Sequence, residues 1–348
     1  MSSDRHDRQR MRRMQKRKRK RIVLSFVVLP LILLMFTAAG YGAFLYKKAE
    51  TVLSDSFLDD GRGKSPLRDA EVHPLKDNVS ILLIGVDGSK AREKNKDFGQ
   101  KLRSDALMVA TLNVEDKSIK LVSIPRDSYV YVPEVEYKTK INHAHAFGGP
   151  KATIETVEEL LDIPIDYYVR MNFYAFMDVV NALDGIKVNV PYELYEKNSE
   201  DKHNAIHLEP GVQILNGEEA LALARTRNYD NDIERGKRQQ AIMEAVITEA
   251  ASIKSISKYD EMLEAIGSNM RTNMTFSEMK SLINYGTNGM PDIENITIAG
   301  TDGRRAGAGY VYEIDDSELE VLKRKLKRHL DIALSSDEDS AIGYAEEN

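Results

Sequence analysis

One uncharged stretch constrains this chain more than any other feature: Ile22 to Tyr46 contains 25 residues and no charged side chain. About 20 consecutive apolar residues are enough for a helix to cross the hydrocarbon core of a bilayer. Pro30 is tolerated in such a helix because neighbouring groups in lipid can satisfy the carbonyl that it leaves free. A cleaved signal peptide would usually have a shorter apolar core and a clear small-residue cleavage site. We therefore expect one transmembrane anchor over residues 22–46.

The charges on the two sides of this stretch differ sharply. Residues 1–21 hold 11 of the 49 basic residues but only 2 of the 55 acidic ones, so 38 basic and 53 acidic residues remain elsewhere. An excess of Lys and Arg marks the cytoplasmic side of an anchor. We expect a single-pass type II protein of the cell membrane, with a cytoplasmic basic arm at 1–21 and an extracytoplasmic body. A basic arm could also bind nucleic acid, but the adjoining anchor favours an orientation signal, so the expected partner is the lipid bilayer and no nucleic acid.

Composition divides the remainder of the chain. Residues 47–77 contain Gly61 and Pro66, which break any long helical pattern, and are expected to form an extracytoplasmic stalk. Residues 78–333 are expected to fold as one catalytic domain, and 334–348 to be an acidic disordered tail. The chain has no cysteine, which excludes disulfides, cysteine-ligated zinc and a thiol nucleophile.

The domain alternates apolar strand patterns with helical ones. Residues 80–87 are a continuous apolar run, as expected of a strand that is covered on both faces. Further strands are predicted at 105–114, 118–125, 164–172, 186–190 and 295–301, and helices at 150–162, 172–183, 217–225, 232–253, 257–267, 275–285 and 316–333. Such alternation predicts an α/β fold, a three-layer α-β-α domain around a mixed central sheet.

Polar side chains gather at the ends of these segments, where α/β proteins place their ligands. They are Asp87, Arg103, Asp105, Arg126, Asp127, Lys140, Arg225, Arg227, Arg235, Arg238 and Gln239. Two carboxylates at strand ends can hold a hard cation such as Mg²⁺, which keeps a few oxygen ligands besides substrate phosphates. Arginines can bind phosphate oxygens through two parallel hydrogen bonds. Together these residues indicate an anion site with a metal, although the mixed charges around 225–238 could also form a solvated face of surface ion pairs.

Spacing separates the arginines into two groups. Arg235 and Arg238 are three residues apart and should share one face of the helix predicted from residue 232, near its N-terminal dipole. Arg225 and Arg227 are two residues apart and could not converge on a regular helix. The preceding helix must therefore loosen there if both arginines are to bind one ligand.

Two histidine pairs, His143 with His145 and His203 with His207, could ligate a metal. Neither pair has a third ligand at a telling spacing. Ordinary hydrogen-bonded histidines are the simpler interpretation of both pairs.

Six short motifs follow one another along the domain: LLIGVD, RSDALMVATLN, VSIPRDSYVYVP, KINHAHAFGG, ALARTR and RGKRQQ. This order, with a basic arm and one anchor before it, resembles the LytR–CpsA–Psr family of cell-wall ligases over residues 76–255 and extends to 333. The resemblance implies a membrane-anchored, Mg²⁺-dependent phosphotransferase of a Gram-positive bacterium. It would attach a glycopolymer, such as wall teichoic acid or capsular polysaccharide, from undecaprenyl-pyrophosphate to N-acetylmuramic acid of peptidoglycan.

The resemblance also assigns roles by position. Asp87 and Asp105 resemble the carboxylates associated with Mg²⁺ (Mn²⁺ could replace it), and with Arg126 they are the catalytic candidates, while Asp127 would orient Arg126. The residues that resemble the pyrophosphate site are Arg103, Arg126, Lys140, Arg225, Arg227, Arg235, Arg238 and Gln239. The residues expected to line an apolar pocket for the prenyl chain, which could equally be plain core, are Leu107, Val157, Leu161, Phe173, Phe176, Val180, Ile242 and Val246.

Two other functions fit the same residues. The protein could be a non-catalytic envelope regulator or transcription attenuator, with the basic arm as its active part. It could also be a polyprenyl-pyrophosphate hydrolase, whose site would look the same. Only the products formed with and without an acceptor would separate the hydrolase from the transferase.

Overall fold

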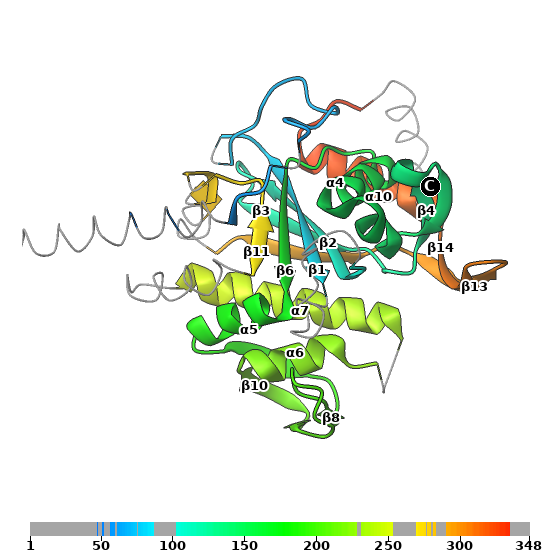
Figure 1. The fold of residues 1–348 in the computed structure, drawn as a ribbon. Coiled ribbons are helices and arrows are strands. Elements are labelled where there is room, and N and C mark those ends of the chain that lie inside the picture. Colours follow the sequence, from blue (N-terminus) through cyan, green and yellow to red (C-terminus); the bar gives the residue numbers. More distant parts are fainter. Residues whose placement is uncertain are drawn as a thin grey trace, which may run out of the picture. The chain divides into compact units, whose positions relative to one another are not determined.

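A six-stranded mixed sheet with the strand order β11-β6-β1-β2-β3-β12 lies at the centre of the domain (Figure 1). Its strands are β1 (Val79–Val86), β2 (Ser104–Asn113), β3 (Ser118–Ser123), β6 (Tyr167–Asn172), β11 (Met270–Thr272) and β12 (Asp292–Thr297). β6 runs parallel to β1 and β12 runs parallel to β3, whereas the other neighbours are antiparallel. The predicted mixed central sheet is confirmed.

The computed structural model describes the domain and part of the segment before it. The described residues are 47, 51, 56–59, 61–74, 76–86, 102–227, 231–252, 269–275, 277–279, 281–282 and 290–334. The predicted basic arm, the anchor at 22–46, the helix at 257–267 and nearly all of the tail lie outside them. In the part of the chain that is described, no helix combines the length and the apolar character needed to span a membrane. Contacts divide the chain into Met1–Thr51 and Val52–Asn348, and the domain belongs to the second unit.

Helices cover both faces of the sheet (Figure 1). One face carries α4 (Asn142–Leu161) and α10 (Asp316–His329), and the other carries α5 (Phe173–Ala182), α6 (Gly217–Arg225) and α7 (Asp232–Ser252). Successive side chains of a strand point to opposite faces. Leu82 and Ile84 of β1 therefore pack in the cluster that contains α4, whereas Ile81 packs in the cluster that contacts α7.

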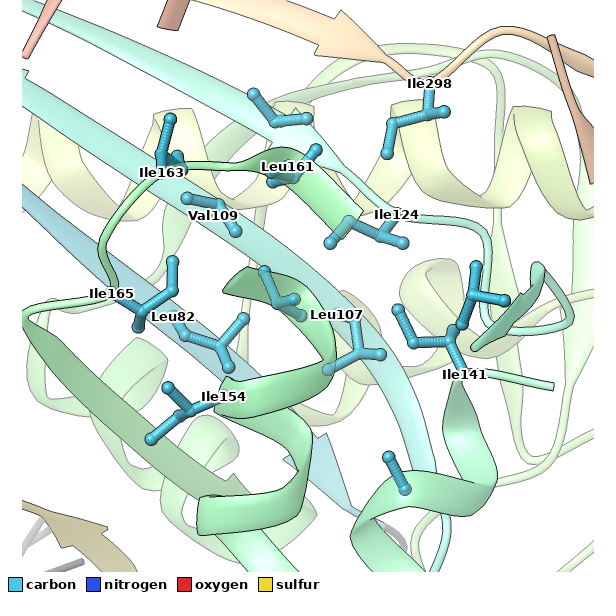
Figure 2. Packing of buried hydrophobic residues seen from close by; sticks show 14 of the residues in the cluster. Leu82, Leu107, Val109, Ile124, Ile141, Ile154, Leu161, Ile163, Ile165 and Ile298 are labelled. Atoms are coloured by element: carbon cyan, nitrogen blue, oxygen red, sulfur yellow. The ribbon is translucent and has the colours of Figure 1, made fainter. Parts of the chain in front are cut away.

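The α4 face is filled by one apolar cluster (Figure 2). Leu82, Leu107 and Val109 contribute from the sheet, and Ile154 and Leu161 from α4, each with an exposed fraction of 2% or less. Burying a side chain of this kind contributes about 1.5–3 kcal/mol relative to leaving it exposed. This face therefore supplies much of the packing energy of the domain.

α4 consists of two helical segments that meet at a kink. Gly148 and Gly149 have non-helical backbone angles, and Gly149 has a φ of 67°, which glycine adopts without a steric penalty. Pro150 then starts the second segment, where its missing N–H costs nothing. The helix predicted at 150–162 is this second segment, and the first segment, which begins at Asn142, is additional.

Two-stranded sheets surround the central one, four of them in the described ranges. They pair β4 (Tyr129–Val132) with β5 (Tyr137–Lys140), β7 (Ile186–Val190) with β10 (Gly211–Leu215), β8 (Leu194–Glu196) with β9 (Ile206–Leu208), and β13 (Gly300–Arg305) with β14 (Gly309–Ile314). A short 3-10 helix, η2 (Pro133–Val135), joins β4 to β5. The strand predicted at 295–301 is divided between β12 and β13.

Local sequence explains where several helices begin and end. The side chain of Asn216 accepts from the backbone N–H of Glu219, whose own side chain accepts from the N–H of Asn216, so α6 starts with a complete capping box. Asp315 caps α10 by accepting from two backbone N–H groups. The helices predicted at 172–183, 217–225, 232–253 and 316–333 are confirmed as α5, α6, α7 and α10. Residues 277–279 and 281–282 of the helix predicted at 275–285 are described, and they are helical.

The predicted stalk at 47–77 is wrong in its second half, because described residues of this segment bind the domain. Arg62 Nη1 donates to Glu158 Oε2 at 3.0 Å, and both side chains are buried. Arg68 donates to both carboxylate oxygens of Asp166, at 2.9 and 2.7 Å. Bidentate pairs of this kind fix geometry as well as charge. This part of the segment therefore belongs to the folded domain.

Candidate active site

A cavity of about 350 Å³ lies between the central sheet and the helices of the α7 face. Its walls are mostly apolar, formed by Leu83, Ile84, Gly85, Ala106, Met108, Val169, Met171, Phe173, Phe176, Leu221, Ala224, Ile242 and Met243. The polar residues that line it are Asp105, Asn172, Arg225, Arg227, Arg235 and Gln239. An apolar pocket with a few polar groups is the usual form of a ligand site. This one fits a ligand with an apolar body and an anionic head.

An irregular register brings Asp105 to this cavity. Antiparallel pairing of β1 with β2 is regular as far as Gly85 opposite Ala106, and then shifts so that Val86 pairs with Ser104. Such bulges re-aim side chains beside active sites. A Cβ added at Gly85 would lie 3.1 Å from the Cβ of Ala106, so glycine permits the close approach of the two strands here.

Arg126, which follows β3, contacts two carboxylates beside the cavity. Its Nη1 donates to Asp105 Oδ1 at 2.6 Å, and its Nε lies 3.4 Å from Asp127 Oδ2. Lys140 Nζ lies 3.1 Å from Asp127 Oδ1. Burial raises the pKa of Asp127, but the hydrogen bond from Lys140 and the charge of Arg126 outweigh burial and hold the pKa below its usual value. Asp127 is therefore ionised and orients both cations.

α6 ends where two arginines reach the cavity. Arg225 is the last residue of α6, and the backbone of Thr226 is extended, with a ψ of 138°. This break allows Arg225 and Arg227 to line one cavity although they are only two residues apart. Cζ of Arg225 also lies 4.7 Å from the centroid of the Phe173 ring, which holds the guanidinium over an aromatic wall of the cavity.

Arg235, in the first turn of α7, is a buried cation at the cavity wall, with an exposed fraction of 5%. Its Nη1 lies 2.7 Å from Asp232 Oδ1, yet within the described structure neither Nη1 nor Nε makes a hydrogen bond. Burial lowers the pKa of Arg235 to about 10, with Asp232 opposing the shift and the charges of Arg227 and Arg126 adding to it. The guanidinium remains charged at neutral pH, and its unused donors suit an anion in the cavity.

Arg238 has a different role from the one predicted. Its Nε donates to the carbonyl of Leu223 at 3.1 Å, and its Nη2 donates to the carbonyl of Thr226 at 2.7 Å. Arg238 is buried and does not line the described cavity. The prediction that it binds pyrophosphate is therefore corrected: its guanidinium supports the chain segment that carries Arg225 and Arg227.

The remaining predicted polar residues lie in different places. Gln239 lines the cavity, and its Nε2 donates to the carbonyl of Ala224 in α6 at 3.2 Å. Lys140 and Arg103 lie outside the lining of the described cavity, and Arg103 is exposed. Asp87 lies outside the described residues.

Three of the residues predicted for the prenyl pocket lie on the wrong side of the sheet. Leu107, Val157 and Leu161 belong to the cluster on the α4 face, where Figure 2 labels Leu107 and Leu161. Neighbouring residues of a strand face opposite ways, so Met108 rather than Leu107 lines the cavity. The pocket prediction is corrected at these three positions. The period of two in β1, β2 and β6 is the signal that could have found the main cavity residues of those strands, such as Leu83, Met108 and Val169, although Ile84 lines the cavity out of this period.

The prediction is more accurate for the pocket residues that lie on α5 and α7 than for Leu107, Val157 and Leu161. Phe173, Phe176 and Ile242 line the cavity. Val180 and Val246 do not line it, and pack instead in a neighbouring cluster among α5, α6 and α7. The pocket prediction is therefore corrected at these two positions as well.

The histidine pairs do not act as pairs in the described structure. His143 Nδ1 lies 2.9 Å from Thr139 Oγ1, whereas His145 Nδ1 lies 2.6 Å from the carbonyl oxygen of Leu102. His207 contacts two surface glutamates, with its Nε2 3.0 Å from the nearer carboxylate oxygen. These contacts agree with the interpretation of ordinary hydrogen-bonded histidines.

Comparison with known proteins identifies relatives along most of the chain. A family model described as the LytR_cpsA_psr family matches residues 47–328. The polyisoprenyl-teichoic acid–peptidoglycan teichoic acid transferase TagT of Bacillus subtilis (strain 168) is 38% identical over 325 residues, which are 92% of this chain and 99% of that protein. The transferase of the same description named TagU, from the same organism, is 34% identical over 322 residues, again 92% and 99%.

Solved structures of relatives share the fold. A structure described as TagT bound to LIIa-WTA has a TM-score of 0.67 and 36% sequence identity, and the match covers 78% of this chain and 98% of that one. A structure of the LytR-CPS2A-psr family protein YwtF (TagT) with bound octaprenyl pyrophosphate lipid has a TM-score of 0.62 and 35% identity, covering 78% and 97%. Both the family model and these relatives extend over most of the sequence, and the chain therefore belongs to the LytR–CpsA–Psr family.

Proposed function

We propose that this chain is a membrane-anchored phosphotransferase that moves a glycopolymer from a polyprenyl pyrophosphate carrier to peptidoglycan. One observation carries the proposal: Arg235 is a buried cation with unused hydrogen-bond donors at the wall of a mainly apolar cavity. A polyprenyl pyrophosphate combines the long apolar part and the anionic group that such a cavity fits. The names of the relatives support this reading, since TagT is named as a teichoic acid transferase and one of its structures was solved with bound octaprenyl pyrophosphate.

The donor would place its prenyl chain along the apolar walls and its pyrophosphate against three arginines, Arg225, Arg227 and Arg235. Guanidinium groups bind phosphate oxygens through paired hydrogen bonds. Exclusion of water from the cavity strengthens these charge interactions relative to an exposed site. Arg126 reaches the same region through its contact with Asp105.

In the proposed reaction, a hydroxyl of N-acetylmuramic acid attacks the phosphorus that carries the glycopolymer. A bond forms between the hydroxyl oxygen and this phosphorus, and the bond from the phosphorus to the bridging oxygen of the pyrophosphate breaks. Polyprenyl phosphate leaves with the bonding electrons, and the glycopolymer becomes attached through a phosphodiester. The hydroxyl proton passes to a carboxylate, for which Asp105 is the described candidate. The arginines neutralise the charge of the transferred group, which is the main requirement of phosphoryl transfer.

Asp105 also fits a role as a Mg²⁺ ligand. Arg126 binds Oδ1 of Asp105, and the Asp105 side chain is 32% exposed and lines the cavity. A carboxylate oxygen of Asp105 can therefore face a cation beside the pyrophosphate. Hard cations prefer carboxylate and phosphate oxygens. Asp87 would supply the second carboxylate. Bound Mg²⁺, or Mn²⁺ in its place, would add positive charge against the pyrophosphate oxygens.

Membrane attachment is proposed from the uncharged stretch at 22–46 and the basic arm before it, which favour a type II orientation. The donor is itself a lipid of the membrane. An anchored domain on the outer side would therefore meet the donor without a soluble carrier.

Replacing Arg235 by Met in the full-length protein tests the proposal, with Lys237→Ala as the control because Lys237 is an exposed cation two residues away on α7. The assay uses protein in lipid nanodiscs, a polyprenyl-pyrophosphate-linked disaccharide and uncross-linked peptidoglycan. Wild type and Lys237→Ala should form the phosphodiester product. Arg235→Met should bind the donor about tenfold or more weakly. Because the substitution also removes the ion-pair partner of Asp232, Asp232→Asn, which breaks the same pair but keeps the guanidinium, separates lost binding from lost stability.

Three results would count against parts of this proposal. Normal donor binding by Arg235→Met contradicts the lipid site. Cleavage of the donor at the same rate with and without peptidoglycan, without a joined product, indicates the hydrolase instead. Full activity in EDTA contradicts the metal, whereas loss of activity that added Mg²⁺ or Mn²⁺ restores supports it.

A further inference from the structure

Three rings lie in contact near the turn between β4 and β5: Tyr137 on β5, and His143 and Phe147 on the first segment of α4. The centroid of the Phe147 ring is 6.4 Å from that of Tyr137 and 6.1 Å from that of His143, and both contacts are edge-to-face. Tyr137 is 51% exposed and Phe147 is 40% exposed. We call these three residues the aromatic surface. Apolar groups gathered on a surface commonly mark a binding site.

Packing does not account for the aromatic surface. Inward side chains beside it already fill the cluster of the α4 face: Val130 and Val132 on β4, the strand paired with β5, and Ile141 and Ala144 at the start of α4. A side chain that keeps about half of its surface in water gains only part of the free energy that full burial provides. Tyr137 and Phe147 therefore leave a substantial part of their apolar ring surface in contact with solvent.

His143 connects the aromatic surface to the charged residues beside the cavity. The contact with Thr139 Oγ1, at 2.9 Å, holds the imidazole ring in place. Burial lowers the pKa of His143, the positive charges of Arg103 and Lys140 lower it further, and Asp127 opposes them. The backbone N–H of Asn142 donates to the carbonyl of Arg126 at 3.2 Å, and Lys140 Nζ lies 3.1 Å from Asp127 Oδ1, so His143 directly follows the segment that contacts these charges.

The aromatic surface and the cavity belong to opposite faces of the sheet. The cavity lies on the α7 face, whereas α4, which carries two of the three rings, covers the other face (Figure 1). A chain of contacts from Asp105 through Arg126 and Asp127 to Lys140 joins the two regions. In phosphoryl transfer the attacking and leaving oxygens lie roughly in line. A lipid phosphate that leaves into the cavity requires the attacking hydroxyl to approach from outside the cavity, and the contacts through Arg126, Asp127 and Lys140 lead from the cavity to the strand that carries Tyr137.

We propose that the aromatic surface binds the acceptor glycan strand of peptidoglycan, an inference that rests on the function proposed above. The C–H faces of uncharged amino-sugar rings stack on Tyr137 and Phe147, whose rings offer large rigid contact areas. His143 lies at the end nearest the phosphate site, where it hydrogen-bonds a hydroxyl of the acceptor. Glu134 and Glu136, beside Tyr137 in the chain, are exposed and repel a polyanionic donor polymer from this surface.

The double variant with Tyr137→Ser and Phe147→Ser tests the inference in the transfer assay with the full-length protein. The KM for soluble peptidoglycan oligomers should rise about tenfold or more, whereas the KM for the lipid donor and the unfolding temperature should not change. Tyr195→Ser, at a tyrosine that is 44% exposed on β8, is the matched control. Tyr137→Phe and Phe147→Tyr should keep the wild-type KM because they keep the rings.

Fluorescence provides a second readout that needs no turnover. The chain has no tryptophan, so Phe147→Trp introduces a single indole at the aromatic surface. Titration with an oligomer of alternating N-acetylglucosamine and N-acetylmuramic acid should change its emission and reach saturation. Tyr195→Trp, at the control position, should show no change.

The outcomes separate this inference from the function on which it rests. Saturable binding by Phe147→Trp without any transfer by wild type would refute the transferase and keep the glycan site. Transfer by wild type with an unchanged acceptor KM in the double serine variant would overturn the glycan site. A rise of the donor KM in place of the acceptor KM would overturn it too, because the surface would then hold the glycan of the donor.

Discussion

Arg126 Nη1 lies 2.6 Å from Asp105 Oδ1, and this contact ties the end of β3 to a carboxylate that lines the cavity. The two side chains are 20% and 32% exposed, so the pair is neither fully buried nor free in solvent. Asp127, on the other side of the guanidinium, is held ionised by Lys140 and Arg126. Arg126 is thus oriented by two acidic neighbours and directed toward the site where charge would develop.

Replacing Arg126 by Ala should therefore affect catalysis far more than stability. Partly exposed ion pairs contribute about 1 kcal/mol or less, whereas loss of one group that stabilises a transition state typically costs about 100-fold or more in rate. The initial rate of transfer and the thermal unfolding temperature measure the two effects. Arg126→Lys should be intermediate, because it keeps the charge and loses the paired hydrogen bonds. An Arg126→Ala variant with the wild-type rate would contradict this role.

Arg238→Met should behave in the opposite way. The substitution leaves the carbonyls of Leu223 and Thr226 without their donors in a buried environment. Such a loss costs about 1–3 kcal/mol in the free energy of unfolding. Urea denaturation should show this decrease in Arg238→Met and not in Lys237→Ala, an exposed position on the same helix. Equal stability of the two variants would mean that Arg238 does not support the end of α6.

Filling the cavity should exclude long prenyl chains. Val169 lines the cavity from β6, so Val169→Phe places a ring in the space proposed for the lipid. Donor KM should rise about tenfold or more for a long prenyl carrier, and less for a ten-carbon carrier that needs less of the cavity. Val212→Phe, on the exposed side of β10, is the control for added apolar surface. If Val169→Phe raised the KM for both carriers equally, the chain would not follow the described walls.

Two buried histidines should make stability depend on pH. Burial, as the largest cause, lowers the pKa of His329 to about 4 and that of His145 to about 4, from a usual 6.5. Between these values the unfolded chain binds more protons than the folded one, so stability is fully present above about pH 6.5 and is lost as the pH falls toward 4. A shift of this size corresponds to roughly 3 kcal/mol for each group.

Urea denaturation at pH 7.0, 5.5 and 4.5 measures this dependence. His329→Gln should reduce the slope of stability against pH, although it also weakens the contacts with Thr111 and Ser118, which are each 2.8 Å long. The slope, rather than the absolute stability, is therefore the diagnostic quantity. An unchanged slope in both His329→Gln and His145→Gln would rule out the buried neutral histidines as its source.

The sequence predicted the elements with strong periodicity and the residues that stand at their ends. β1 and β2 follow from continuous apolar runs, and α7 from its long helical stripe, because burial on one or two faces imposes these patterns directly. The spacing of Arg225 and Arg227 predicted that the helix must loosen there if both arginines bind one ligand, and α6 does end at Arg225. Asp105, Arg225, Arg227, Arg235 and Gln239 do line one cavity.

The failures have a common physical cause, since each depends on contacts between segments far apart in the chain. Arg235 and Arg238 are the same residue type and were predicted to share one face of α7. Only the position of α6 decides that Arg238 donates to its carbonyls while Arg235 lines the cavity. Leu107 and Met108 are both apolar, and only the register of the sheet decides which face each takes. The contact between Arg68 and Asp166 likewise could not be predicted from the residues around Arg68, because the Gly and Pro residues of that segment indicate only an irregular chain.

The cavity on the α7 face occupies volume that side chains fill in the interior of most domains. A prenyl chain that enters it would complete the packing of that layer, so the substrate would act as a stabilising ligand. At a free concentration one hundred times the dissociation constant, such a ligand adds about 2.7 kcal/mol to the folded state. A cell short of lipid carrier would then hold a less stable protein, which is cleared faster by proteolysis. The amount of this protein in the envelope would thereby follow the supply of its donor without any dedicated regulator.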